Sequence, residues 1–256
     1  LLVCCFPFLI GADAPDPLAG LDEAITAGMK TAEIPGLAIA IVKDDKVVFA
    51  KGFGTRKLGE MEPVDAKTLF AIGSTTKPFT AALLAMGVSE GKLNWDDPVS
   101  KFMPGIEFSD PLVTRELTVR DLLSHRSGLP DHGGDLLFVG YAYDRHDLIR
   151  RIRFLKPDSS FRSRYAYQNL MYMIAGEMAG QIALKPWDQL LSERIFIPLG
   201  MEDTNTSVRT LSGYKNVATP HGVIEDKVTV INYRNIDSAG GAGCINSNAH
   251  DLAIWV

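Results

Sequence analysis

The chain has 256 residues, of which 46% are hydrophobic and 22% are charged, the composition of a globular protein that can bury a full core. Its net charge of −5 at neutral pH argues against nucleic acid as the main partner. Cys244 is the one cysteine beyond the first five residues, so the sequence offers no framework of disulfides.

The first residues, LLVCCFPFLIGADA, form an apolar run that is too short to span a bilayer alone. The run resembles the hydrophobic region of a secretory signal, followed by a small-residue cleavage site at Ala12 and Ala14. We therefore interpret residues 1–14 as a partial signal segment and expect a secreted or periplasmic protein, tethered to the membrane if the segment is not cleaved. A buried N-terminal strand is the alternative. The missing initiator Met indicates a start inside the natural reading frame.

The pattern of apolar and turn residues predicts an α+β chain. An amphipathic helix at 18–29 precedes a hairpin of strands at 36–43 and 47–53. A central helix starts at Ser74 and stops at Gly91, and because it is apolar on every face it must be buried. The remaining predicted elements are a capping box at 118–121, helices at 144–155, at 168–179 with a stop at Gly180 and from Pro186 to a stop at Pro198, strands at 221–224 and 227–232, and a helix at 247–255.

The pattern Ser-x-x-Lys occurs three times, and helical context distinguishes the first pair, Ser74 and Lys77. On a helix, side chains three residues apart share a face, with Cβ atoms about 5–6 Å apart. The pair at 89–92 straddles a helix end, and the pair at 212–215 lies in a Gly-containing loop. The positive field of a helix N-terminus favours charge on the Ser74 oxygen and disfavours a protonated Lys77. Lys77 is therefore a candidate base toward a nucleophilic Ser74.

The pattern Tyr-x-Asn also occurs three times, at 167–169, 214–216 and 233–235. The first precedes a buried helix, so its side chains can point into the interior, whereas the others lie in polar stretches. Tyr167 is a candidate to exchange a proton with Ser74 if a neighbouring cation lowers its pKa from about 10. Asn169 would then orient Lys77 or a substrate amide. An ordinary helix cap with a core tyrosine is the alternative.

These motifs together resemble a known family. The STTK of residues 74–77, the YQN of 167–169 and the LLSHRSGLP of 122–130 are similar to the serine β-lactamase and penicillin-binding protein superfamily. The branch is that of class C β-lactamases, with family VIII esterases, D-aminopeptidases and DD-carboxypeptidases. The PLGM of 198–201, and SAGGAG followed by DLAIW at 251–255, extend the resemblance from about Ile34 to the last residue.

The resemblance implies a serine hydrolase that works through an acyl-enzyme. It makes Ser74 the acylated nucleophile, Lys77 its general base or electrostatic partner, Tyr167 the proton shuttle, and Asn169 a contact to substrate or Lys77. No candidate for the deacylating glutamate of class A enzymes is present, which fits the class C branch. The substrate stays open among esters, β-lactams and D-amino-acid peptides. The resemblance implies no cofactor, and the histidines have no metal-ligand spacing. The oligomeric state stays open.

The implied fold is that of β-lactamases and DD-peptidases, with an antiparallel sheet flanked by helices and a large helical subdomain at roughly 80–215. Residues 15–256 would then be an incomplete catalytic domain. The family's third motif, a Lys- or His-initiated triplet ending in Gly, would lie on a strand after Val256 together with further strands of the sheet. On this reading we expect the chain alone to be inactive and poorly soluble.

Two other readings remain. A catalytically silent relative could serve as a binding or scaffold protein, although such a relative has no physical need for a lysine in a buried first turn. The arginine-rich stretch at 150–164 could instead bind a membrane or nucleic acid, which the acidic overall composition disfavours.

Overall fold

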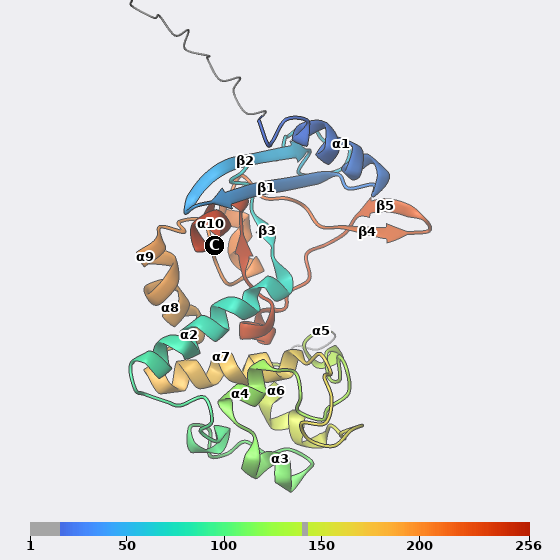
Figure 1. Cartoon of the computed structure of the whole chain (residues 1–256). Coiled ribbons are helices and arrows are strands. Elements are labelled where there is room, and N and C mark those ends of the chain that lie inside the picture. Colours follow the sequence, from blue (N-terminus) through green and yellow to red (C-terminus); the bar gives the residue numbers. More distant parts are fainter. Residues whose placement is uncertain (1–15, 140–142) are drawn as a thin grey trace, which may run out of the picture.

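A computed structural model of the chain describes residues 16–139 and 143–256. The predicted signal segment at 1–14 lies outside the described residues. The hairpins and the two terminal helices α1 (Leu21–Thr31) and α10 (Ala249–Trp255) gather at one end of the molecule, and most of the other helices lie toward the opposite end (Figure 1). The chain thus crosses from the strands to the helical region and returns.

The predicted α+β class is confirmed, with the antiparallel strands arranged in small sheets. The strands pair as β1–β2, β3–β6 and β4–β5. The helices between the terminal two are α2 (Lys77–Ser89), α3 (Pro111–Glu116), α4 (Val119–Leu123), α5 (Leu136–Val139), α6 (Arg145–Arg151), α7 (Asn169–Ala183), α8 (Trp187–Leu191) and α9 (Ile197–Leu199). The strands are β1 (Gly36–Lys43), β2 (Lys46–Gly54), β3 (Phe70–Ala71), β4 (His221–Ile224), β5 (Lys227–Val230) and β6 (Asn246–Ser247).

Both predicted hairpins turn through two residues with positive φ. The turn between β1 and β2 has φ of 50° at Asp44 and 57° at Asp45, and the turn from β4 to β5 repeats this pattern. Left-handed conformation at both central residues matches the twist of the strands that they join. Strand β5 ends at Val230, two residues before the predicted end, because the next position faces Pro220, which has no N–H to continue the ladder.

The core is built around α2 and α7, which pack against each other (Figure 1). Both helices are apolar on all faces, as predicted, and Phe79 of α2 and Ile174 of α7 are fully buried. Trp187 of α8 packs in the same cluster. Because the N-terminal ends of α2 and α7 carry the candidate site residues, this packing holds that site in place.

Two predicted helix stops are wrong. Helix α7 continues through Gly180 to Ala183, and Leu184 takes the left-handed conformation instead. Gly180 is needed for close packing, since a Cβ there would lie 2.7 Å from the carbonyl oxygen of Lys185. Pro198 lies inside α9, where a preceding π-helical segment, Ser192–Phe196, widens the backbone and accommodates the missing N–H.

Two predicted helices also begin or end differently. The helix expected at 247–255 begins at Ala249, because Ser247 pairs with Phe70 in the β3–β6 ladder and Asn248 caps the helix. The helix expected at 144–155 tightens after Arg151 into a 3-10 turn at Ile152–Phe154. The predicted capping box of α4, Thr118 with Asp121, is confirmed.

Replacing Phe79 by Ala tests the central packing. The ring is fully buried, stacks on Trp255 at a centroid distance of 4.2 Å and meets Phe196 edge-on at 5.9 Å. We expect Phe79→Ala to lower the free energy of unfolding by about 3–5 kcal/mol, measured by urea denaturation of the natural polypeptide that carries this chain. Met61→Ala, at a side chain that is 90% exposed, should stay within about 0.5 kcal/mol of the parent. Equal losses in both variants would contradict the proposed core.

Candidate active site

Ser74 and Lys77 lie on either side of the boundary between two helical forms. Ser74 belongs to a 3-10 turn, Gly73–Thr76, and Lys77 is the first residue of α2. The predicted α-helical start at Ser74 is therefore a tighter turn, in which side chains three residues apart eclipse each other. Ser74 is exposed, whereas Lys77 is 6% exposed, and Lys77 Nζ lies 3.0 Å from Ser74 Oγ.

The amine of Lys77 contacts oxygen atoms from three parts of the chain. Besides Ser74 Oγ, Lys77 Nζ donates to Asn169 Oδ1 at 2.8 Å and to the carbonyl oxygen of Ala242 at 2.8 Å. Burial lowers the pKa of Lys77 from 10.5 to about 8, and the negative charge of Asp135 opposes that fall. A substantial fraction of the amine is therefore neutral at mildly alkaline pH.

Tyr167 lies on the other side of Ser74. Its hydroxyl donates to Ser74 Oγ at 2.5 Å, and Lys77 Nζ lies 4.7 Å from the centre of its ring. His125 stacks on this ring at 4.5 Å and His132 lies against it at 5.0 Å. The hydroxyl, the amine and the nucleophile candidate thus form one hydrogen-bonded group.

Asn169 is the first residue of α7, and its amide bridges two charged side chains. Asn169 Oδ1 accepts from Lys77, and Asn169 Nδ2 donates to Asp135 Oδ2 at 2.9 Å. The structure therefore brings Ser74, Lys77, Tyr167 and Asn169 together. It adds Asp135, which no spacing or periodicity in the sequence had indicated.

The loop at 130–135 holds the Tyr-x-Asn motif through hydrogen bonds of both main-chain and side-chain atoms. Asp131 Oδ1 accepts from the backbone N–H of Tyr167 at 2.7 Å, and the N–H of His132 donates to the carbonyl oxygen of Tyr167 at 2.8 Å. Gln168 Nε2 donates to the carbonyl oxygens of Pro130 and Gly133, each at 3.0 Å. The preceding segment also holds the motif, because the carbonyl oxygen of His125 accepts from the N–H of Ala166 at 2.8 Å and His125 Nδ1 accepts from the N–H of Gln168 at 3.0 Å.

The SAGGAG segment brings the Ala242 carbonyl to Lys77. Gly240 has φ 44°, a conformation that L residues rarely adopt, and a Cβ on Gly241 would lie 2.8 Å from Thr80 Oγ1 and 2.8 Å from the carbonyl oxygen of Tyr172. Thr80 Oγ1 donates to the Gly241 carbonyl oxygen at 2.9 Å. The small residues therefore allow this backbone to lie directly against α2 and α7.

A half-buried arginine holds the start of the same segment. Arg145 of α6 forms a bidentate pair with Asp188 of α8, at 2.7 and 3.0 Å, and donates to the carbonyl oxygen of Asp237. Its pKa is raised above the usual range by Asp188 despite burial, which keeps it charged. Arg145 thus ties two helices to the segment that ends at Ala242.

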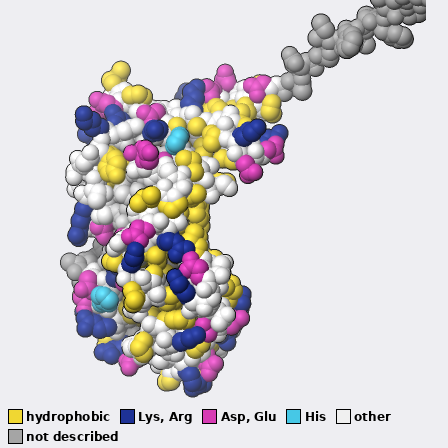
Figure 2. All heavy atoms as spheres, turned by 90° about the vertical axis from the view of Figure 1, so that its left-hand side faces the viewer, with side chains coloured by type: hydrophobic (Ala, Val, Ile, Leu, Met, Phe, Trp, Pro, Cys, Tyr) yellow, Lys and Arg dark blue, Asp and Glu magenta, His cyan; other side chains and the backbone are white. Residues whose placement is uncertain are grey.

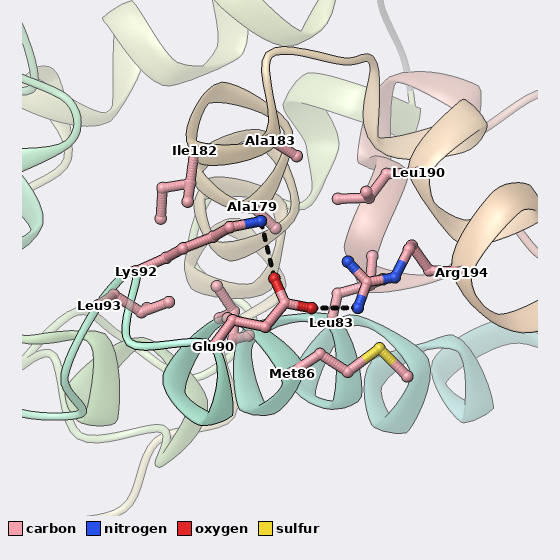
Figure 3. A pocket seen from close by; sticks show the side chains of 12 residues that line it. Leu83, Met86, Glu90, Lys92, Leu93, Ala179, Ile182, Ala183, Leu190 and Arg194 are labelled. Atoms are coloured by element: carbon pink, nitrogen blue, oxygen red, sulfur yellow. Dashed lines mark hydrogen bonds and ion pairs between the residues drawn. The ribbon is translucent and has the colours of Figure 1, made fainter.

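Residues of the competing Ser-x-x-Lys and Tyr-x-Asn matches bind partners outside the site around Ser74. Lys92 of the second Ser-x-x-Lys pair binds Glu90, which also binds Arg194, at the rim of an apolar hollow between the C-terminal parts of α2 and α7 (Figure 3). This hollow lies at the opposite end of α2 from Ser74. In the second Tyr-x-Asn match, Asn216 Nδ2 donates to Asp65 on both carboxylate oxygens. Lys92 and Lys215 of the competing Ser-x-x-Lys matches are exposed, so Lys77 is the buried lysine of the three.

The arginines of the 150–164 stretch have partners of their own. Arg150 pairs with Asp147, Arg153 with Glu107 and Arg164 with Asp158. Arg151 lies over the ring of Tyr143, 3.8 Å from its centre. On the face drawn in Figure 2, side chains of both charge signs are interspersed. The arginines therefore form ion pairs and ring contacts instead of a free basic face.

Within residues 16–139 and 143–256, no group of three or more His, Cys, Asp or Glu side chains is arranged to hold a metal ion. In the same part of the chain, no helix has the length and apolar character needed to cross a membrane.

Comparison with known proteins identifies the family. The beta-lactamase family profile matches residues 21–256. The unguisins hydrolase ungD of Aspergillus violaceofuscus is 31% identical over 95% of this chain and 46% of its own length. Penicillin-binding protein 4* of Bacillus subtilis is 26% identical over 80% of this chain and 48% of its own length. This chain belongs to the beta-lactamase family, and it spans about half the length of the curated relatives that it matches.

Solved structures confirm the fold inferred from the motifs. An octameric penicillin-binding protein homologue from Pyrococcus abyssi aligns with a TM-score of 0.83 and 26% identity, over 94% of this chain and 55% of that chain. A class C beta-lactamase aligns with a TM-score of 0.76 and 22% identity, over 93% of this chain and 63% of that chain. The second likeness shows the fold alone.

The buried amine of Lys77 makes a prediction about stability. Its pKa is about 8 in the folded chain and 10.5 for free lysine, so between these values the unfolded state binds more protons and the free energy of unfolding rises with pH. Lys77→Met removes this contribution. We expect the stability of Lys77→Met relative to the parent to be highest below pH 8 and to fall as the pH rises toward 10.5.

Urea denaturation of the natural polypeptide on either side of this pH window measures the difference. Lys67→Met, at an exposed side chain, controls for the loss of one positive charge. A stability difference between Lys77→Met and the parent that does not change with pH would contradict the lowered pKa.

Proposed function

We propose that this chain supplies the nucleophile, the base and the proton shuttle of a serine hydrolase that works through an acyl-enzyme. The observation that carries the proposal is that Ser74 Oγ lies within hydrogen-bond distance of both Lys77 Nζ and the Tyr167 hydroxyl. An exposed hydroxyl beside a buried amine of lowered pKa is one arrangement in which an adjacent base activates a nucleophile. The substrate is an ester, a β-lactam or a D-amino-acid peptide.

In the acylation step, Ser74 Oγ attacks the substrate carbonyl carbon and its proton passes to neutral Lys77. The new ammonium is stabilised by the oxygens of Asn169 and Ala242, which already accept from Nζ. The Tyr167 hydroxyl gives its proton to the leaving group, which departs as the carbonyl reforms. The Lys77 ammonium then returns a proton to Tyr167, so both groups regain their starting protonation states. In deacylation the same groups deprotonate a water and return the proton to Ser74. General acid–base transfers of this kind contribute about 10²–10⁴-fold each.

The substrate proposal draws on the relatives. The family acts on small molecules or peptides, and one relative, at 31% identity, is named as a hydrolase of unguisins. Because this chain spans 46% of that relative, an unguisin is a first substrate to test on the natural polypeptide rather than an assigned one. The apolar segment at 1–14 supports the further proposal that the protein is secreted or periplasmic.

A catalytically silent relative that only binds ligands is the second candidate. It has the same family membership, but it gives no reason for Lys77 to be buried with a lowered pKa beside an exposed serine. Labelling of the natural polypeptide with a fluorescent penicillin or a fluorophosphonate separates the two candidates, because only a reactive serine forms a covalent adduct.

Ser74→Ala tests the nucleophile. We expect it to abolish fluorophosphonate labelling and to reduce hydrolysis of a short-chain p-nitrophenyl ester by at least about a thousand-fold, because no other hydroxyl shares the Lys77 contact among the described residues. Ser89→Ala changes the exposed serine of the second Ser-x-x-Lys match and should label like the parent. If Ser74→Ala kept the parent rate, the assignment would be wrong.

Tyr167→Phe tests the proton shuttle. It keeps the ring that stacks on His125 and removes the hydroxyl that reaches Ser74. We expect the steady-state rate with the same ester to fall about 10²–10⁴-fold. Tyr214→Phe, in the second Tyr-x-Asn match, is the matched control and should keep the parent rate. A parent-like rate in Tyr167→Phe, with thermal melting unchanged, would refute the shuttle role.

A further inference from the structure

We propose that Asp135 is a positioning residue for this site: it fixes the orientation of the Asn169 amide and so directs the lone pair of Lys77 at Ser74. The inference rests on the proposed function, because it concerns how Lys77 is prepared to take a proton from Ser74. It assigns a role to a carboxylate that the motifs do not contain.

A neutral lysine amine has two N–H donors and one lone pair. Lys77 Nζ has three oxygen neighbours, on Ser74, Asn169 and Ala242. The Ala242 carbonyl can only accept, and so can the Asn169 amide oxygen. Both N–H groups are therefore taken by these two acceptors. The lone pair is left facing the Ser74 hydroxyl, the one neighbour of the three that can donate.

This hydrogen-bond arrangement around Lys77 depends on the orientation of the Asn169 amide. With its amide reversed, Asn169 would present Nδ2 to Lys77, and the amide N–H would compete with Ser74 for the lone pair. The same reversal would set the amide oxygen against the carboxylate of Asp135, which accepts from Nδ2 at 2.9 Å in the observed orientation. A carboxylate without a proton has no donor to offer that oxygen, so Asp135 excludes the reversed form.

Stability of the fold does not explain the presence of a carboxylate at position 135. Its Oδ1 is buried without a hydrogen-bond partner among the described residues, while Oδ2 accepts from Asn169 and lies 2.8 Å from His132 Nδ1. A buried oxygen of a charged group without a partner costs stability. A residue that is costly to the fold and that touches Asn169 is better explained by what it does to the site.

Asp135 also differs in charge from the other titratable groups around Lys77. Those groups are the phenols of Tyr167 and Tyr172, whose rings lie 4.7 and 5.4 Å from Nζ, and the imidazole of His125. Asp135 is the carboxylate of the set, and its charge raises the pKa of Lys77 against the effect of burial. Loss of that charge should therefore move the titration of Lys77 to lower pH, which a purely structural role would not do.

Asp135→Asn is the first test, because it keeps the shape and removes the charge. The second-order rate of fluorophosphonate labelling of Ser74 is measured against pH in the natural polypeptide. In this pH–rate profile, the rise that follows deprotonation of Lys77 is the Lys77 limb. We expect this limb to move to lower pH by roughly one unit. The plateau rate should fall about ten-fold, because the Asn169 amide can reverse. Asp131→Asn, on the same loop but bonded to the backbone of Tyr167, is the matched control and should shift the limb by less than half as much.

An exchange of the two side chains provides a rescue. In Asp135→Asn with Asn169→Asp, a carboxylate accepts from Lys77 and the new amide at 135 donates to it, so the neighbour of Nζ is again only an acceptor. We expect the exchange variant to regain most of the plateau rate that Asp135→Asn loses and to move the limb back to higher pH. A merely structural Asp135 predicts a further loss on exchange, and that result would overturn the inference.

His132 offers a variant at an exposed side chain, since it is 58% exposed and its Nδ1 lies 2.8 Å from Asp135 Oδ2. His132→Arg sets a permanent cation beside Asp135 and should move the limb to lower pH, whereas His132→Gln should leave it in place. Two results would refute this inference and leave the proposed function standing. They are a Lys77 limb that does not move in His132→Arg, and a parent-like rate and limb in a folded Asp135→Asn. Failure of the proposed function looks different, because the parent protein would then not label at Ser74 at all.

Discussion

The burial of one amine, that of Lys77, is the constraint on which the candidate site depends. Removing an ammonium from water costs several kcal/mol, whereas hydrogen bonds to a charged group contribute about 1.5–3 kcal/mol each. Three oxygens surround Nζ, so the two effects are of similar size. The negative charge of Asp135 also opposes the effect of burial on the pKa of Lys77, which falls to about 8, where both protonation states are accessible. A base needs this property, since it must take up a proton and release it again.

The three oxygens come from distant parts of the chain, and each is positioned by a different physical device. Ser74 is fixed by a tight 3-10 turn before α2, and Asn169 by its place at the start of α7. Ala242 reaches Lys77 because Gly240 and Gly241 let the backbone lie against both helices. The packing of α2 on α7 therefore determines the site geometry as well as the core.

The sequence predicted most of this arrangement where the signal was local. Apolar spacing identified both buried helices, and helical context selected Ser74 and Lys77 from three equivalent matches. The misses were long-range. Gly180 reads as a helix stop, yet it serves contact with the backbone at Lys185. Asp135 shows no periodicity, and it reaches Asn169 only because the 130–135 loop is bonded to the residues around Tyr167.

The same distinction separates the residues that do chemistry from those that prepare it. Ser74 and Tyr167, the proposed nucleophile and proton shuttle, are recognisable by type, because these two roles need particular atoms. Asp135 acts as an acceptor toward the Asn169 amide, and no local pattern in the sequence marks an acceptor that lies 34 residues away. Its role follows from the oxygen that Asn169 presents to Lys77, which is a property of the folded site. The proposed role of Asp135 is therefore inferred from hydrogen-bond direction rather than from a motif.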